Sequence, residues 1–239
     1  NGTFTNISNS AGISSVGHLS FCASFFDYDN DGDLDMYLMN HSIHTTHSYG
    51  NIKLREKSDE QSGDILFENK QNAGQIKFED VTKSAGIYNS ALGYGLALST
   101  ADVNNDGYLD IYVGNDFHEN DYLYINNKNK TFTEASTDYF NNTSRFTMGV
   151  DIEDVNNDLL LDIFTLDMMP YNSEIFLKSG GEDTDKINQI KESFGFQQQY
   201  ARNHFQLNNG DHFSDVALIT NTYATDWSWS PLILDYNND

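Results

Sequence analysis

The chain has 239 residues, and its 13 Lys and Arg against 36 Asp and Glu give a formal net charge of −23. Such an acidic chain is a poor partner for nucleic acid or for an anionic membrane. Hydrophobic residues make up 38% of it, enough for a packed core, and no apolar run approaches the roughly 18 residues of a membrane-spanning helix. We therefore expect a folded acidic protein without a transmembrane segment in this chain.

Three short elements recur in the same order along the chain. They are an acidic loop, a β-branched or aromatic run that ends in Asn, and a short run that contains an apolar or aromatic residue between polar ones. The acidic loops begin at Asp27, Asp102, Asp154 and Asp235. The other runs are residues 65–69, 122–126 and 204–208, and residues 2–7, 76–81, 130–135 and 211–216. Runs of this kind followed by turn-forming residues predict β-strands.

One repeat therefore reads as strand, acidic loop, strand, strand, turn and strand. Four short strands per repeat predict a β-propeller blade, so the expected fold class is all-β. We expect a partial propeller of about three and a half blades over residues 1–239. Its parts are the end of a preceding blade (1–13), three blades (17–81, 93–135 and 146–216) and the start of a further blade (226–239). Because a closed propeller needs about four to eight blades, we expect a piece of a longer chain or of a larger surface assembly.

Two insertions interrupt the repeats. Residues 41–64 are polar, and we expect a hydrogen-bonded loop there, with Zn²⁺ or Cu²⁺ binding by its histidines as the alternative. Those histidines are His41, His44 and His47. Residues 170–203 predict a short amphipathic helix that starts near Asp183 and ends at Gly195, with coil as the alternative.

Four side chains outside the loops are also distinctive. Cys22, the single cysteine, lies in an apolar run and is expected to be a buried strand residue. Trp227 and Trp229 alternate, so they share a face, and packing in the core or between blades is favoured over sugar stacking. His118 lies in an acidic stretch that could contact a ligand.

The first acidic loop has the oxygen pattern of a calcium site. Ca²⁺ takes about six to eight oxygen ligands, and side chains at alternate positions of a tight loop converge on one point. The predicted ligands, from the first position to the ninth, are Asp27, Asp29, Asp31, the carbonyl of Asp33, and Asp35. Gly32 at the sixth position permits the positive φ that such a turn commonly needs.

Two further loops repeat this pattern. The predicted ligands are Asp102, Asn104, Asp106, the carbonyl of Tyr108, and Asp110 in the second loop, and Asp154, Asn156, Asp158, the carbonyl of Leu160, and Asp162 in the third. Leu159 stands where the other loops have Gly, and a left-handed leucine costs roughly 1–2 kcal/mol. We therefore expect the third site to be weaker or to reach its geometry differently. The fourth loop holds Asp235, Asn237 and Asp239 without a closing residue and is expected to be incomplete.

An EF-hand is one alternative for these loops. It requires a Glu at the twelfth position and flanking helices, whereas Leu38, Val113 and Thr165 occupy that position and the flanks alternate like strands. The other alternative is a turn without metal. Three copies in the same register, each closed by Asp, favour calcium.

Longer stretches of the chain resemble the FG-GAP/VCBS repeat family of integrin-alpha-like propellers. They are residues 27–35, 113–124, 166–170 and 224–231. The same stretches are most similar to the bacterial branch related to cartilage acidic protein, the ASPIC/UnbV-associated proteins. This resemblance implies a calcium-dependent propeller on an extracellular or outer-membrane-associated protein, with binding or adhesion as its usual role.

The expected function is therefore a non-enzymatic surface module that binds a protein or glycan, with Ca²⁺ in a chiefly structural role. We expect it to be extracellular or on the cell surface, and outer-membrane-associated in a Gram-negative source. The alternative is a calcium-supported propeller enzyme such as a polysaccharide lyase. Convergence of His118, Arg145 or the histidines of residues 41–47 with a Tyr in one pocket would favour the enzyme.

Overall fold

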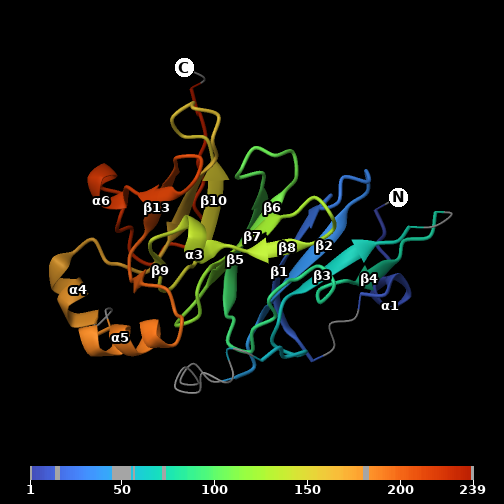
Figure 1. The fold of residues 1–239 in the computed structure, drawn as a ribbon, viewed down its shortest axis with the longest axis horizontal. Helices are drawn as coiled ribbons and strands as arrows, with labels where there is room; N and C mark the ends of the chain where they lie inside the picture. The colour runs from blue at the N-terminus through green and yellow to red at the C-terminus, as the bar shows by residue number, and fades with distance from the viewer. Residues whose placement is uncertain are drawn as a thin grey trace.

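The computed structural model describes residues 2–13, 17–44, 55, 57–71, 74–179 and 183–237. The described residues form three four-stranded antiparallel sheets, which lie side by side (Figure 1). They also form one separate two-stranded parallel sheet. The chain is mostly β, which confirms the all-β prediction at this level. None of the helices in the described ranges has the length and apolar character needed to cross a membrane.

Within each large sheet the strands pair in chain order. The first sheet contains β1 (Leu19–Phe26), β2 (Asp35–His41), β3 (Ile65–Asn69) and β4 (Phe78–Asp80), and the second contains β5 (Gly95–Ala101), β6 (Asp110–Asn115), β7 (Tyr122–Asn126) and β8 (Phe132–Glu134). The third contains β10 (Gly149–Glu153), β11 (Asp162–Leu166), β13 (His204–Asn208) and β14 (Phe213–Asp215). β9 (Thr143–Ser144) pairs with β12 (Gln199–Tyr200). The acidic loops join the first two strands of each sheet, as predicted.

The core lies between neighbouring sheets. Val113 of β6 packs in a cluster with Leu66 of the first sheet, whereas the adjacent Tyr112 packs with Ile163 of the third sheet. Successive side chains of a strand point to opposite faces, so β6 is apolar on both sides and is buried along its whole length. The second sheet is therefore sandwiched between the other two.

The segment after the last strand of one sheet covers the next sheet. The Phe132 N–H donates to the Ala85 carbonyl at 2.7 Å, which ties the segment after β4 to β8. Gly86 has a φ of +77°, and a Cβ added there would lie 2.9 Å from the Phe132 carbonyl oxygen. Gly12, beside α1 (Ser8–Ala11), makes the same close approach to Phe78 of β4. Both glycines stand in the sequence Ser-Ala-Gly-Ile, at residues 10–13 and 84–87, so this sequence recurs where such a segment meets the last strand of the following sheet.

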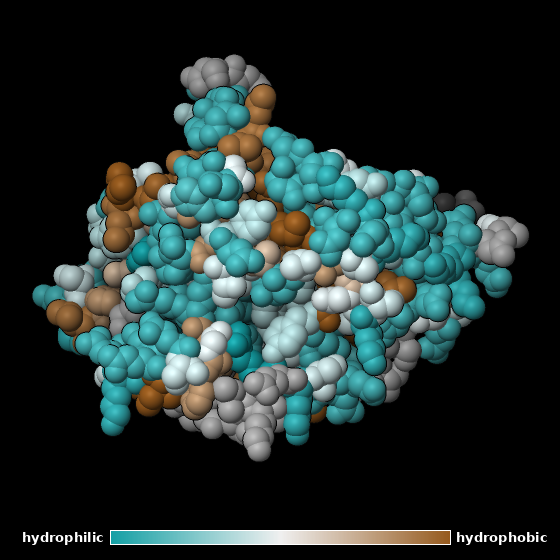
Figure 2. Space-filling view, viewed as in Figure 1, coloured by the Kyte–Doolittle hydropathy of each residue, from teal (hydrophilic) through white to brown (hydrophobic). Residues whose placement is uncertain are grey.

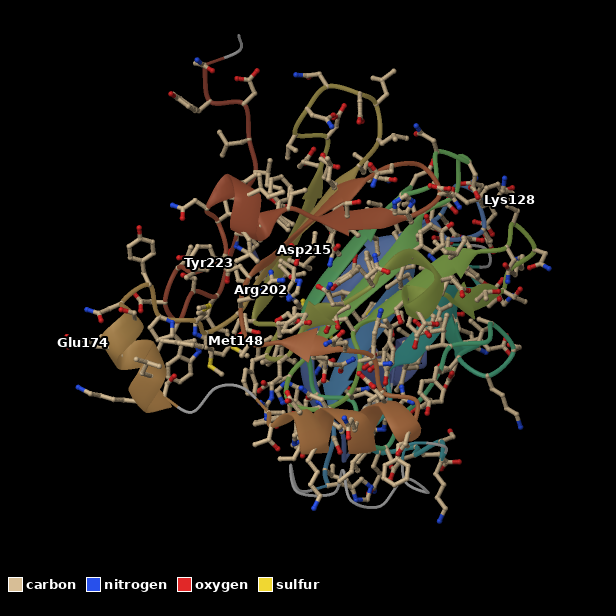
Figure 3. All side chains as sticks on the ribbon, turned by 60° about the vertical axis from the view of Figure 1, so that its left-hand side comes forward. Lys128, Met148, Glu174, Arg202, Asp215 and Tyr223 are labelled. Carbon is tan, nitrogen blue, oxygen red and sulfur yellow. The ribbon has the colours of Figure 1, made fainter. Side chains whose placement is uncertain are left out.

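Two more short helices follow the last strands of the second and third sheets, α3 (Ser136–Tyr139) and α6 (Ala217–Thr220). At the start of α6 the Asp215 carboxylate accepts a hydrogen bond from the Ala217 N–H at 3.1 Å. Arg202 lies beside Asp215, with 2.7 Å between Nη2 and Oδ2 (Figure 3). In Figure 2 the visible face is largely hydrophilic, and an apolar patch lies over α6, where Leu218 and Ile219 are exposed.

The insertion of residues 170–203 contains α4 (Ser173–Ser179), which the sequence did not indicate, and the predicted helix α5 (Asp185–Ser193). The Thr184 hydroxyl caps α5 by accepting from the Ile187 N–H at 3.4 Å, and Gly195 follows the helix with a φ of +76°. Lys191 on the buried side of α5 donates to Gln199 of β12 at 2.8 Å. The helix prediction is confirmed.

Two burial predictions are wrong. Cys22 is exposed, because β1 is the edge strand of its sheet and its first residues have no sheet over them. Trp227 and Trp229 lie outside any strand, 65% and 48% exposed, and stack on each other with 6.3 Å between ring centroids. Alternation alone does not bury a residue, because burial also needs a neighbouring element over that face.

A buried acid follows the second strand of the second sheet. Asp121 accepts from the Asn115 N–H and the Tyr112 hydroxyl, both at 2.7 Å. Asp64 makes the same bonds in the first sheet, from the Asn40 N–H and the Tyr37 hydroxyl, both at 2.8 Å.

In the third sheet the Asp and the Asn of this contact change places. Here Asp167 donates its N–H to the Asn203 side chain at 2.8 Å, and Phe164 stands where the other sheets have Tyr. The position that Asp121 occupies in the second sheet can therefore hold an amide side chain within the same fold.

Burial raises the pKa of Asp121 to about 7, and its hydrogen bonds from Tyr112, Asn115 and Thr147 oppose that rise only in part. An unfolded Asp titrates at about 3.9. Since the folded chain holds this proton more tightly, the stabilising contribution is complete below about pH 4 and is lost as the pH rises through about 7.

We expect Asp121→Asn to flatten this pH dependence. The free energy of unfolding of the unmodified chain should fall more between about pH 5 and about pH 8 than that of the variant, as measured by urea denaturation at a fixed calcium concentration. Asp138→Asn, at an exposed residue of α3, is the control. Parallel curves for the unmodified chain and Asp121→Asn would contradict the assignment.

Candidate metal centre

The three acidic loops adopt one backbone conformation and lie at the same end of the sheets (Figure 1). At the fourth position Asn30, Asn105 and Asn157 have φ of 58°, 59° and 59°. At the sixth position Gly32, Gly107 and Leu159 have φ of 93°, 88° and 71°. Asn and Gly adopt left-handed conformations readily, which explains their repeated use in these turns.

The acidic side chains of each loop fold inward onto the backbone of the same loop. The carboxylate at the first position accepts from the N–H of the fifth, at 3.1 Å in the first loop, 2.9 Å in the second and 3.2 Å in the third. Its other oxygen accepts from the N–H of the sixth, at 2.9, 2.7 and 2.9 Å. The predicted ligand positions are therefore equivalent in all three loops.

The first loop brings three carboxylates together. One oxygen each of Asp27, Asp29 and Asp35 lies within 4.8 Å of the others, and no other such group of His, Cys, Asp or Glu occurs among the described residues. Oxygens bound to one Ca²⁺ lie about 2.3–2.6 Å from it, so they can be at most about 5 Å apart. These three carboxylates therefore fit a calcium ion.

Positive charge already lies near these acids. Lys130, from the turn between β7 and β8, places Nζ 2.5 Å from Asp29 Oδ2 and 2.7 Å from Glu68 Oε1. Asp33, at the seventh position of this loop, has a buried Oδ1 with no hydrogen-bond partner. Burial raises the pKa of Asp33, and the charges of Asp31 and Asp29 add to that rise. A divalent cation would relieve this repulsion.

The second loop has an amide in place of one acid. Asn104 Oδ1 accepts from the Asp106 N–H at 3.1 Å, as Asp29 does from Asp31 in the first loop at 3.2 Å. An amide oxygen is also a calcium ligand, so the donor set stays suitable. Lys128 Nζ lies 3.4 Å from Asp106 Oδ2. Burial raises the pKa of Asp110, the closing residue, to about 7.

The third loop keeps this geometry despite lacking its glycine. Leu159 takes the left-handed conformation and donates its N–H to Asp154 Oδ2 at 2.9 Å, with its side chain 79% exposed. Leu160 donates to Asp158 Oδ1 at 2.9 Å, the bond that Tyr108 makes to Asp106 in the second loop. The loop thus reaches the common conformation with a residue that is strained in it.

The fourth loop is described only in part. Asn237 donates its N–H to Asp235 Oδ1 at 3.1 Å, as Asn156 does to Asp154 in the third loop at 3.3 Å. Asp239 lies outside the described residues.

Each closing aspartate is held by an asparagine that the ligand pattern missed. The Oδ1 atoms of Asp35, Asp110 and Asp162 accept the backbone N–H of Asn69, Asn126 and Asn208, in each case at 2.8 Å. Their Oδ2 atoms accept the N–H of the second loop position at 3.2, 3.0 and 3.1 Å. The signal was present in the sequence, because the third strand of every repeat ends in Asn.

The histidines of the first insertion have separate partners. His41 stacks on Phe21 with 5.1 Å between ring centroids, and His44 Nε2 lies 2.8 Å from Asp59 Oδ2. His47 lies outside the described residues. His41 and His44 therefore do not form a joint metal site with any third such ligand in the described part of the chain.

Two of the cavities formed by the described residues lie away from the loops. One of about 280 Å³ is lined by Arg145 with mostly apolar residues, and its described lining contains neither His nor Tyr. The other, a cleft of about 770 Å³, brings together His18, Lys83 and Tyr88 with Glu60 and Asp80. Its size suits a ligand site, and no single motif of the sequence pointed to it.

We expect Leu159→Gly to raise the free energy of unfolding by about 1 kcal/mol, because glycine removes the left-handed penalty of roughly 1–2 kcal/mol at some cost in chain entropy. Gly107→Leu is the reciprocal variant and should destabilise the chain, since a Cβ there meets nothing within 4 Å and only the backbone conformation opposes it. Urea denaturation measures both. Equal stability of all three proteins would show that Leu159 is unstrained.

A family model described as an FG-GAP-like repeat matches residues 102–165. The match begins at the first residue of the second loop and ends within β11, so it spans the second and third loops and the strands between them. No curated protein matches the chain. The match supports an FG-GAP-like repeat over residues 102–165.

Proposed function

We propose that this chain is a calcium-binding β-propeller module of an extracellular or cell-surface protein and that it acts in binding or adhesion. The observation that carries the proposal is the group of Asp27, Asp29 and Asp35 oxygens within 4.8 Å of one another. The loop that presents them recurs twice with the same turn conformations and the same internal hydrogen bonds. FG-GAP repeats are typical of extracellular proteins, which supports the location.

Calcium would hold the loop conformation. The ligands would be the side chains at the first, third, fifth and ninth positions of each loop with the carbonyl of the seventh, as predicted from the sequence. A bound divalent cation supplies positive charge that offsets the repulsion among these carboxylates. The loops connect the first two strands of each sheet, so the role we propose for the ion is structural.

The propeller arrangement is supported by how the sheets pack. Each is a four-stranded antiparallel meander, and β1 and β10, the first strands of the outer sheets, both lie near β5, the first strand of the middle sheet, as in propeller blades. The resemblance to the bacterial proteins related to cartilage acidic protein adds the expectation of a secreted or outer-membrane-associated protein.

We further propose that the ligand is a protein or a glycan and that the module binds it without catalysis. The Arg145 cavity has no described His or Tyr in its lining, which speaks against a lyase site there. For the enzyme alternative, side chains that can act as acid and base lie together in the cleft lined by His18, Lys83 and Tyr88. Glycan retained on an array without release of unsaturated products supports binding, whereas turnover that Tyr88→Phe abolishes would establish the lyase.

Removal of calcium should lower the melting temperature. A site filled at about 100 times its Kd contributes about 2.7 kcal/mol, so excess Ca²⁺ after EDTA treatment should raise the melting temperature, and metal analysis should detect calcium. Asp31→Ala should reduce this rise in melting temperature more than Asp158→Ala does. The third loop is strained at Leu159, so its site is expected to be weaker and to contribute less.

Asp138→Ala, at an exposed acid outside the loops, is the matched control. Mg²⁺ at the same concentration should substitute poorly, since it demands near-octahedral geometry. Melting that is indifferent to EDTA, with no calcium found by metal analysis, would refute the proposal. A greater effect of Asp158→Ala than of Asp31→Ala would refute the ranking of the loops.

A further inference from the structure

The acidic loops of neighbouring sheets are connected through asparagine side chains. Asn126, at the end of β7, is 2% exposed and donates its backbone N–H to Asp110 Oδ1 at 2.8 Å. Its Nδ2 donates to the Leu109 carbonyl at 3.2 Å, so the residue holds the second loop at two points.

The same Nδ2 group reaches the first loop. It donates to the carbonyl oxygen of Tyr28 at 2.7 Å, a contact between residues 98 positions apart in the chain. Tyr28 occupies the second position of the first loop, and its N–H donates to Asp35 Oδ2 at 3.2 Å. An amide has two donor hydrogens, so Asn126 satisfies both carbonyls.

Asn208 repeats this arrangement between the second and third loops. Its N–H donates to Asp162 Oδ1 at 2.8 Å, and its Nδ2 donates to the Val103 carbonyl at 2.9 Å. Val103 in turn donates its N–H to Asp110 Oδ2 at 3.0 Å. One unbroken series of contacts therefore runs through Asp35, Tyr28, Asn126, Asp110, Val103, Asn208 and Asp162.

A second contact joins the same pairs of loops. Asn30 Nδ2, at the fourth position of the first loop, donates to the Gly107 carbonyl of the second loop at 3.0 Å. Asn105 Nδ2 donates to the Leu159 carbonyl of the third loop at 2.7 Å. The first and second loops are thus each fixed to the following sheet through their second and fourth positions, and the fourth position meets the sixth position of the following loop.

We propose that Asn126 and Asn208 are positioning residues shared by neighbouring loops, so that calcium in one loop raises the calcium affinity of the next. This inference rests on the proposed calcium function. Calcium binding must restrict the remaining motion of the loop side chains and carbonyls that contact the ion, which costs conformational entropy. Because Asn126 holds both loops, ordering one loop already restricts part of the other, and the second ion meets a smaller cost.

The test uses a chain in which two loops remain. Asp158→Ala disables the third loop, and calcium binding to the first and second is followed by titration calorimetry with CaCl₂. We expect a Hill coefficient above 1. Disabling the first loop with Asp31→Ala should then weaken calcium binding at the second by about two- to tenfold, the range that one net hydrogen bond supports.

Breaking the two bridges should remove this dependence. In a chain with Asn30→Ala and Asn126→Ala added, the Hill coefficient should fall to 1, and Asp31→Ala should leave the affinity of the second loop unchanged. The backbone N–H of residue 126 remains for Asp110, so the second loop keeps that hydrogen bond.

The matched control carries Asn69→Ala and Asn157→Ala. Asn69 holds the first loop as Asn126 holds the second, with Nδ2 bonded to the Leu34 carbonyl at 3.1 Å within its own sheet. Asn157 is the fourth residue of the disabled loop. This control also replaces two asparagines by alanine but keeps Asn30 and Asn126, so cooperativity should persist in it. The inference would be overturned if the parent chain had independent sites, or if cooperativity survived the loss of Asn30 and Asn126. Absence of any calcium binding would instead refute the proposed function itself.

Discussion

The closing aspartate of each acidic loop accepts two backbone hydrogen bonds, one from its own loop and one from the third strand of its sheet. Asp110 is buried, and burial of a carboxylate is costly unless N–H groups satisfy it. The Val103 and Asn126 N–H groups meet this need, one from the loop and one from the third strand. The acidic loop is thereby fixed to its sheet. The Asn126 side chain then fixes that sheet to the one before it.

Charge explains why the loops are acidic and yet ordered. The carboxylate at the first position of each loop accepts from two backbone N–H groups of its own loop, which stabilises its ionised form but leaves several negative charges close together. Lys130 offsets part of this charge in the first loop from a different sheet. A bound calcium ion, as we propose, would offset more of it. Away from the loops, the third sheet has Asn203 where the other sheets have a buried Asp, and Phe164 where they have the Tyr that donates to it.

The proposed functions are separated in space. The acidic loops lie at one end of the sheets, whereas α4, α5 and the described residues of the first insertion lie away from them (Figure 1). The cleft lined by His18, Lys83 and Tyr88 contains none of the predicted calcium ligands. A structural role for calcium is consistent with this separation, because the ion would stabilise the sheets without touching a ligand bound in the cleft.

The acidic loops, helix α5 and the unusual Leu159 could be predicted from the sequence, since each depends on residues within about ten positions of one another. The four-strand repeat could be predicted because these short patterns recur in the same order. It also excluded the EF-hand, through the residues at the twelfth position. Which asparagines bridge the loops, the contact of Lys130 with Asp29, and the exposure of Cys22 and the two tryptophans became visible in the folded chain alone. The bridging contacts join residues 98 and 105 positions apart, and no local pattern specifies which sheet will lie against which.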